Sequence, residues 1–333
     1  MYSTVPNDPN FPSDLRIVPS TSKVIQVGAR VGAGAGNSSD DDAGQDIEGF
    51  GIAGRTWEAA YAMRLYLSPP AADVQYAPPC PLYAAPPSSK PSRHTLLEIG
   101  SGTGYLSLAL APHLPPSATL ILTDLASVVP LLSRNLLEAR SRWMTNIHPS
   151  SVSQVKVEAL PWGDEEALRE LSLFREAERD DEEVTILASD LVYFPFLYPP
   201  LLRTLLWLTK PRRDGGKSPK VLFAYKVRSL VREEPFWSAF EGRWFDMESV
   251  LTRSTPPASS SPAKDPPCVR FGEEDDIHIF VCTRRPSTFD LPIPSSDEHL
   301  MRGSPGDATS ASDQFELMLF SGISLDSDSE DDT

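Results

Sequence analysis

Three glycines at alternate positions follow a short apolar run in LLEIGSGTGYLSLAL, which covers residues 96–110. Gly100, Gly102 and Gly104 leave the backbone bare, so a ligand can approach the chain closely there. A glycine-rich turn between a strand and a helix is typical of nucleotide sites. The spacing is tighter than the G-x-G-x-x-G spacing that suits a pyrophosphate, which favours a ligand without one. For the glycines alone, an ordinary turn is an equal alternative.

An acidic residue, Asp124, ends the next apolar segment, ILTD. A carboxylate at the end of the strand that follows a glycine loop can accept hydrogen bonds from both ribose hydroxyls of a nucleoside. The same side chain could instead cap the helix that follows. Together, the glycine loop and the acid predict a nucleoside-containing ligand, and they leave NAD and S-adenosylmethionine as alternatives.

Alternating strands and helices are needed to bring such residues to one edge of a sheet, and the sequence contains them. Apolar, β-rich segments are expected to form strands at 95–100, 118–124, 155–160, 184–193, 220–227 and 276–285. Segments with helical spacing separate them at 105–114, 126–140, 196–208 and 235–244. This alternation predicts an α/β fold with a mostly parallel sheet covered by helices on both faces.

The residues ahead of the glycine loop are predicted to form smaller elements. Residues 23–31 and 47–54 could pair as a hairpin. A helix is expected over 56–67, with Thr56 as its N-cap. The proline-rich stretch 68–92 cannot be a helix or a central strand, so it is interpreted as an insertion.

The domain boundaries follow from composition. Residues 1–22 are expected to be a flexible arm, 23–285 the folded domain, and 286–333 a disordered acidic tail. Inside the domain, loop insertions are expected at 209–220 and 254–268, besides the one at 68–92.

Charge and cysteine content exclude several classes of function. The formal net charge is −16, and ten Asp/Glu against one Arg fall between Ser295 and Thr333. A chain of this charge is not expected to bind nucleic acid through its bulk charge. Three scattered cysteines argue against a disulfide framework or a zinc site. No apolar run suggests a signal peptide or a membrane span, so we expect a cytoplasmic protein, with the nucleus as a second compartment.

Six stretches together resemble the eukaryotic seven-β-strand, S-adenosylmethionine-dependent protein-lysine methyltransferases, in particular the methyltransferase-like twenty-one group. They are GRTWEAAYAMRLYL, LEIGSGTGYLSL, TDLASVVPLLSRNL, EALPWGD, ASDLVYFPFLYPPLLRTL and EDDIHIFVCTRR. The glycine motif is common to many methyltransferases, whereas the combination of Trp57, LPWG and DLVY is much more specific. The resemblance implies a Rossmann-like fold with a seven-stranded sheet. The long insertion at 68–92 and the acidic tail depart from the family.

The resemblance also implies a role for each matching residue. Asp124 would hold the ribose, Trp162 would lie against the adenine, and Trp57 would close over the cofactor. Asp190 and Tyr193, as the catalytic residues, would face the incoming lysine. The full set expected to contact S-adenosylmethionine is Trp57, Glu98, Gly100, Ser101, Gly102, Gly104, Asp124, Trp162 and Ser189. Structural alternatives remain: core packing for the aromatic residues, ion pairing for Glu98, and a cap on the helix near Pro195 for Asp190.

Such residues suit the chemistry of methyl transfer. The amine attacks the sulfonium methyl carbon in line, so alignment and exclusion of water provide most of the rate, and no metal is needed. A carboxylate such as Asp190 can orient the lysine ammonium and then hold the amine hydrogens. An aromatic face such as that of Tyr193 suits a methylammonium product.

The predicted function is therefore transfer of a methyl group to a lysine of a protein substrate by a monomeric enzyme. The resemblance suggests a chaperone, a AAA ATPase or an elongation factor as the substrate. The alternatives are methylation of a small amine and a non-catalytic binding module with a vestigial cofactor pocket. A dehydrogenase is disfavoured by the glycine spacing and by DLVY.

Overall fold

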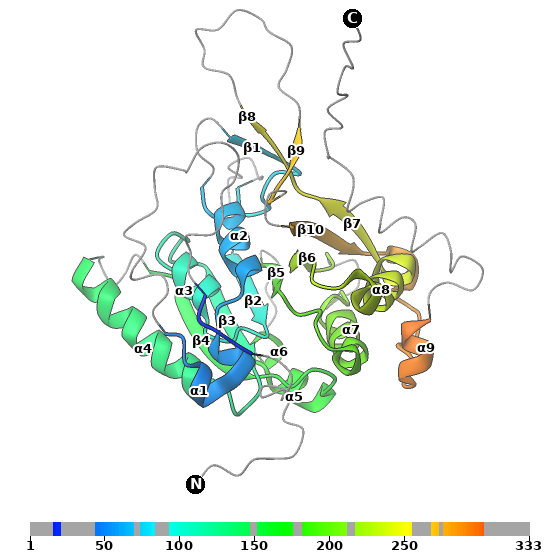
Figure 1. Cartoon of the computed structure of the whole chain (residues 1–333), viewed down its shortest axis with the longest axis horizontal. Coiled ribbons are helices and arrows are strands. Elements are labelled where there is room, and N and C mark those ends of the chain that lie inside the picture. The colour runs from blue at the N-terminus through cyan, green and yellow to red at the C-terminus, as the bar shows by residue number, and fades with distance from the viewer. Residues whose placement is uncertain are drawn as a thin grey trace, which may run out of the picture.

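A seven-stranded sheet runs through the centre of the protein in the computed structural model (Figure 1). Its strand order is β4-β3-β2-β5-β6-β10-β7. In chain order the strands are β2 (Arg93–Ile99), β3 (Thr119–Asp124), β4 (Gln154–Ala159), β5 (Glu182–Ser189), β6 (Lys220–Lys226), β7 (Phe245–Ser249) and β10 (Ile277–Arg284). The structure describes residues 16–20, 44–69, 74–83, 93–146, 152–175, 182–211, 217–254, 268–272 and 276–302.

The sheet is mostly parallel, as the alternation of strands and helices predicts. β2 to β6 are parallel to their neighbours, while β10 lies antiparallel between β6 and β7. The Rossmann-like, seven-stranded fold is thus confirmed. β7 was not expected from the sequence, because this short edge strand buries only Phe245 and carries the exposed Asp246 and Glu248.

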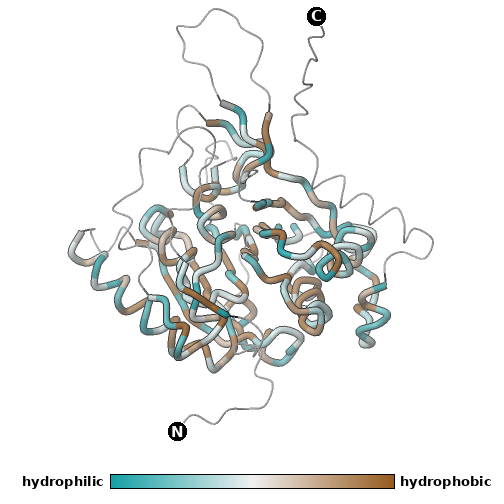
Figure 2. Tube along the Cα trace, in the orientation of Figure 1, coloured by the Kyte–Doolittle hydropathy of each residue, from teal (hydrophilic) through white to brown (hydrophobic). Residues whose placement is uncertain are grey.

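Helices cover both faces of the sheet because successive strand residues point to opposite sides. Leu96 packs with one face, which is covered by α2 (Glu58–Leu67), α3 (Tyr105–Leu110) and α4 (Val129–Asn146). Leu97 packs with the other face. That face is covered by α5 (Glu165–Glu170), α6 (Ser172–Arg175), α7 (Tyr198–Leu208), α8 (Leu230–Ala239) and α9 (Asp297–Met301). Figure 2 shows apolar and polar residues alternating along α4, as expected of a helix with one buried face.

The N-terminal hairpin prediction is wrong for the part that the structure describes. Residues 47–54 form a short helix, α1 (Ile47–Phe50), followed by a 3-10 turn (Gly51–Gly54). Asp46 caps α1 by accepting a hydrogen bond from Gly49 N at 2.9 Å, and this local bond favours a helical turn over a strand. The other half of the expected hairpin, 23–31, lies outside the described residues.

A second, three-stranded sheet lies beside the main one, in the order β1-β8-β9. β1 (Val74–Ala77) comes from the proline-rich insertion and pairs antiparallel with β8 (Leu251–Ser254), which pairs in turn with β9 (Val269–Arg270). β1 is an edge strand, in keeping with its surrounding prolines. Tyr76 attaches it to α2 by an edge-to-face contact with Tyr66 at 5.2 Å.

Both ends of the folded domain extend further than the sequence predicts. Residues 16–20 were expected to be a flexible arm, yet the side-chain amide of Gln45 donates to Ser20 O and accepts from Ser20 N. After residue 286, where the disordered tail was expected to begin, α9 packs on α7 and buries Leu300 completely. Tertiary packing orders this short polar helix. Residues 303–333 lie outside the described part of the chain. Among the described helices, none is long and apolar enough to cross a membrane.

We predict that Leu300→Ala lowers the free energy of unfolding by about 2–5 kcal/mol, the usual cost of a cavity at a fully buried leucine. The matched control is Leu291→Ala, since Leu291 is 41% exposed in the same segment; its cost should stay within about 0.5 kcal/mol. Urea titration followed by circular dichroism measures both. Equal, small effects would contradict the docking of α9.

Candidate functional site

A pocket opens where the carboxyl ends of β2, β3 and β5 meet, and residues from the loops after these strands line it. The residues expected from the sequence that line it are Trp57, Glu98, Gly100, Ser101, Gly102, Asp124, Trp162, Ser189, Asp190 and Tyr193. Gly104 lies at the start of α3, behind the loop. Parallel strands present their carboxyl ends at one edge, so this convergence follows from the topology.

The glycine loop adopts a backbone that other residues tolerate poorly. Gly100, Gly102 and Gly104 have φ angles of 60°, 52° and 75°. A Cβ on Gly100 would lie 2.8 Å from Cζ2 of Trp162, and one on Gly102 would lie 3.0 Å from Ala53 O. The loop therefore needs glycine both for its conformation and for the close approach of its neighbours.

Asp124 holds the glycine loop from the end of β3. Its carboxylate accepts hydrogen bonds from Gly102 N at 2.8 Å and from Leu125 N at 2.7 Å, one on each oxygen. Each oxygen keeps acceptor capacity on the pocket that Asp124 lines. Burial raises the pKa of Asp124 to about 6, although the two amides oppose the shift. A ligand with two hydroxyl donors would satisfy this carboxylate.

Glu98 is a second acid in the pocket, and it is buried on β2. Its Oε2 accepts from the backbone N of Ser107 at 3.2 Å and from the Ser107 hydroxyl. Burial is the main reason that the pKa of Glu98 rises to about 7, and the charge of Asp124 adds to the rise. The alternative of an ion pair with a Lys or Arg is not what the structure shows, because Ser107 at the start of α3 holds the Glu98 carboxylate. Glu98 stays a prediction for cofactor contact.

The hydroxyl of Ser189, at the end of β5, is buried and has no hydrogen-bond partner among the described residues. An unpaired buried hydroxyl is costly, so a ligand is the natural partner for this one, which lines the pocket. Trp162 lies beside Gly100 at the same wall. Both residues remain predictions for ligand contact, now with a position that allows it.

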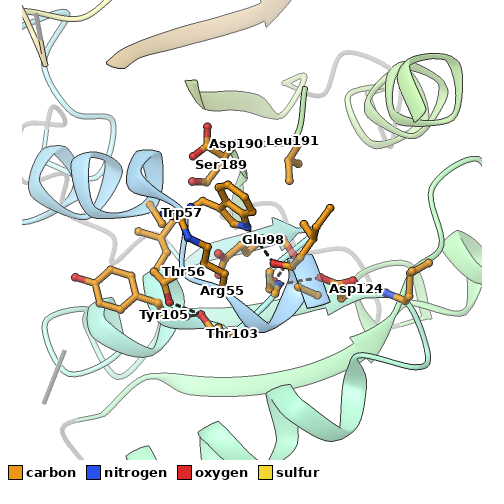
Figure 3. Close-up of a pocket in the computed structure, with 18 of the residues that line it drawn as sticks. Arg55, Thr56, Trp57, Glu98, Thr103, Tyr105, Asp124, Ser189, Asp190 and Leu191 are labelled. Carbon is orange, nitrogen blue, oxygen red and sulfur yellow. Dashed lines mark hydrogen bonds between the residues drawn. The ribbon is translucent and has the colours of Figure 1, made fainter. Parts of the chain in front are cut away.

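Trp57 lies across the site in Figure 3, with Ser189 and Asp190 on one side and Thr56 and Thr103 on the other. Its indole N–H donates to Ile52 O at 3.0 Å. The hydroxyl of Thr56 bonds that of Thr103 in the glycine loop at 2.9 Å, so Thr56 does not cap α2 as the sequence predicts. These bonds join the start of α2 to the pocket.

Asp190 adopts a left-handed conformation, with φ at 58°, and its side chain is only 1% exposed. Both oxygens already have two donors. Oδ1 accepts from Lys226 N at 3.1 Å and from Arg228 Nη1 at 2.8 Å. Oδ2 accepts from Ala59 N at 3.2 Å and from Arg228 Nη2 at 3.0 Å. Asp190 therefore caps a helix, but the helix is α2 rather than the one near Pro195.

Tyr193 lines the pocket and continues into an aromatic run. Its ring meets Phe194 edge-on at 4.9 Å, and Phe194 stacks on Phe196 at 5.4 Å. Phe196 is 63% exposed, so the run leads from the pocket to the surface. Burial raises the pKa of the Tyr193 phenol, which keeps its proton at neutral pH.

The sequence does not reveal two arginines beside this site. The guanidinium of Arg55 lies 4.1 Å from the ring centre of Trp57, and that of Arg228 lies 5.0 Å from it. Arg55 lies only two residues before Trp57, so its proximity could have been found. Arg228 lies in a loop without a motif, and only the fold brings it to Trp57. Within the described ranges, no cluster of three or more His, Cys, Asp or Glu could hold a metal ion.

Comparison with known proteins gives matches among methyltransferases. A family model described as lysine methyltransferase matches residues 38–243, more than half of the chain. The protein N-lysine methyltransferase METTL21A of Xenopus tropicalis is 26% identical over 165 residues, which are 50% of this chain and 59% of that protein. This chain thus spans less than two thirds of the length of that relative.

Solved structures of other methyltransferases are also similar. An O-methyltransferase family 2 protein from Planctomyces limnophilus DSM 3776 is 14% identical, with a TM-score of 0.35, and covers 68% of this chain and 58% of its own. The carbon methyltransferase CurJ is 17% identical, with a TM-score of 0.33, and covers 60% and 50%.

We predict that Gly100→Ala lowers the free energy of unfolding by roughly 1–2 kcal/mol, because alanine disfavours a left-handed backbone. It should also block ligand binding, since its methyl group would press on Trp162. The control is Gly272→Ala, with φ at 74° and outside the pocket lining, which should also lose stability but keep binding. Denaturant titration and calorimetry with S-adenosylhomocysteine measure both. Intact binding by Gly100→Ala would contradict the close fit.

Proposed function

The chain belongs to the lysine methyltransferase family, and from that premise we propose that it transfers the methyl group of S-adenosylmethionine to a lysine side chain of a protein substrate. The observation that carries the proposal is the set of unsatisfied acceptors and donors in one pocket. Asp124 has free acceptor capacity, Ser189 has an unpaired hydroxyl, and the glycine loop leaves space between them.

These residues fit S-adenosylmethionine. We assign the methionine end to the loop of Gly100 to Gly102, the ribose to Asp124, and the adenine to the wall made by Trp162 and Ser189. Trp57 and its neighbours on α2 form the opposite wall. The fit rests on chemistry. The ribose hydroxyls can donate to Asp124, a cofactor atom can pair with the buried hydroxyl of Ser189, and the flat adenine can lie against the indole of Trp162.

The cofactor, when bound, supplies an electrophilic methyl carbon on a sulfonium. The chain has to bring a neutral lysine amine into line with that carbon and keep water out. Tyr193 offers an aromatic face and a protonated hydroxyl at the pocket, and the run to Phe196 offers an apolar path from the surface. A methylammonium product is stabilised by such aromatic faces.

The surroundings of Asp190 favour a different role from the catalytic one expected from the sequence. Four donors already occupy its carboxylate, so it has little capacity to accept a proton from the lysine while Arg228 stays in place. We therefore propose that Asp190 serves the reaction by fixing the position of α2 and the loop before Tyr193. The lysine would then lose its proton to solvent as it leaves water for the less polar surroundings of the pocket.

The substrate is proposed at two levels. We favour a protein lysine over a small amine because an aromatic run leads from Tyr193, in the pocket lining, to the exposed Phe196, where a polypeptide could lie. The resemblance suggests a chaperone, a AAA ATPase or an elongation factor. Methylation of a small amine is the second candidate, since the same core handles many acceptors.

The test is to incubate the recombinant protein with cell lysate and S-adenosylmethionine that carries a labelled methyl group. Asp124→Ala is the matched inactive control. The proposal expects label in a protein band that yields methyl-lysine on hydrolysis, with the wild type only. Label confined to small molecules would support the second candidate. If the wild type binds no S-adenosylhomocysteine, the result would support the alternative of a non-catalytic binding module.

We predict that cofactor affinity is constant above about pH 7 and falls by up to about tenfold per pH unit below about pH 6. Burial raises the pKa of Asp124 to about 6. Ribose hydroxyls bind the ionised carboxylate, so at lower pH a proton must leave before binding. Calorimetry with S-adenosylhomocysteine at several pH values measures the dependence.

Two variants separate the acids in this experiment. Asp124→Asn should bind more weakly and show no change near pH 6. Glu98→Gln should keep the fall near pH 6, because the group that it removes titrates near pH 7. A wild-type affinity that stays flat across this range would rule out Asp124 as the ribose acceptor.

A further inference from the structure

Arg228 contacts Asp190, Glu58 and the ring of Trp57, although it does not itself line the pocket. It lies in the loop between β6 and α8, and its side chain is 30% exposed. Its guanidinium forms a two-pronged ion pair with Asp190, at 2.8 and 3.0 Å. Two parallel bonds of this kind fix both distance and orientation, which a lysine could not do.

A second carboxylate completes the setting of Arg228. Its Nη2 also lies 3.3 Å from Oε2 of Glu58, the first residue of α2. Burial alone would lower the pKa of Arg228, but the charges of Asp190 and Glu58 outweigh it, and the pKa is raised. The guanidinium is therefore charged at every physiological pH, and it ties α2 to the ends of β5 and β6.

The same guanidinium lies 5.0 Å from the ring centre of Trp57, the indole that walls the pocket. Arg55 contacts that ring as well, at 4.1 Å, and Arg55 is paired with Glu58. The two arginines differ in what they anchor. Arg55 belongs to the same segment as Trp57, whereas Arg228 connects that segment to the sheet.

We infer that Arg228 is a positioning residue that holds Trp57 and the start of α2 against the cofactor pocket. It acts through Trp57 and Asp190 and does not touch the reacting atoms. The inference rests on the proposed function, because the wall that it fixes is the wall of the proposed cofactor site. Loosening Arg228 should let the indole move away and speed the escape of the cofactor.

The test measures how S-adenosylhomocysteine dissociates from Arg228→Lys, which keeps the charge but loses the two-pronged, planar contact. We expect dissociation about tenfold faster than in the wild type, on the scale of a lost cation–π contact. The matched control is Arg232→Lys, at an exposed arginine in the first turn of α8, which should dissociate at the wild-type rate. Arg228→Met should show a larger effect, provided that its circular dichroism matches the wild type.

A double-mutant cycle separates positioning from a general loss of stability. In a Trp57→Leu background, Arg228→Lys should change the dissociation rate much less than it does in the wild type, because the ring through which it acts is gone. The same fold-change in both backgrounds would overturn the inference. So would a wild-type dissociation rate in Arg228→Lys. If the wild type binds no S-adenosylhomocysteine, the result contradicts the proposed function, and the inference about Arg228 is rejected together with it.

Discussion

The buried carboxylate of Asp190 is the interaction on which the site depends. It joins the start of α2, the end of β5 and the loop after β6, which lie far apart in the sequence. An unpaired carboxylate at this depth would be strongly unfavourable, so its donors must all be in place when the chain folds. The left-handed backbone of Asp190 aims the side chain at them. The Thr56–Thr103 bond also holds the start of α2 near the glycine loop, but Asp190 is the group that joins α2 to the ends of β5 and β6.

Three acids line the pocket, two of them buried and Asp124 half-buried, and they differ in the number of donors that each one has. Asp190 has four donors and no free capacity. Asp124 has two, and Glu98 has its donors on one oxygen. The pKa values of Asp124 and Glu98 are raised because burial exceeds the stabilisation that their few donors supply. On this basis we propose Asp124 and Glu98 as ligand contacts and Asp190 as a group that fixes the position of the surrounding elements.

The sequence predicts what local pattern determines. Alternating apolar segments placed the central strands, and glycine spacing placed the loop, because both depend on residues near one another. The prediction of a hairpin strand over 47–54 was wrong because an apolar, glycine-rich stretch suits either a strand or a turn. The hydrogen bond from Gly49 N to the Asp46 side chain favours the helical turn. Arg228 could not be found, because its contacts with Asp190 and Trp57 exist only in the folded chain. Likewise α9 is ordered by packing on α7 rather than by its own polar sequence.

This arrangement changes how the effect of an Asp190 substitution should be interpreted. Loss of methyl transfer on replacing this acid would ordinarily suggest a general base. Here the same replacement would also free Arg228, remove the cap of α2 and release Trp57 from one of its two cations. A fall in turnover with unchanged cofactor dissociation would indicate that Asp190 acts on the lysine substrate. A fall in turnover with faster cofactor dissociation would indicate that Asp190 positions Trp57 and α2 at the cofactor pocket. Because one carboxylate joins both sides of the pocket, only the two rates together can assign its role.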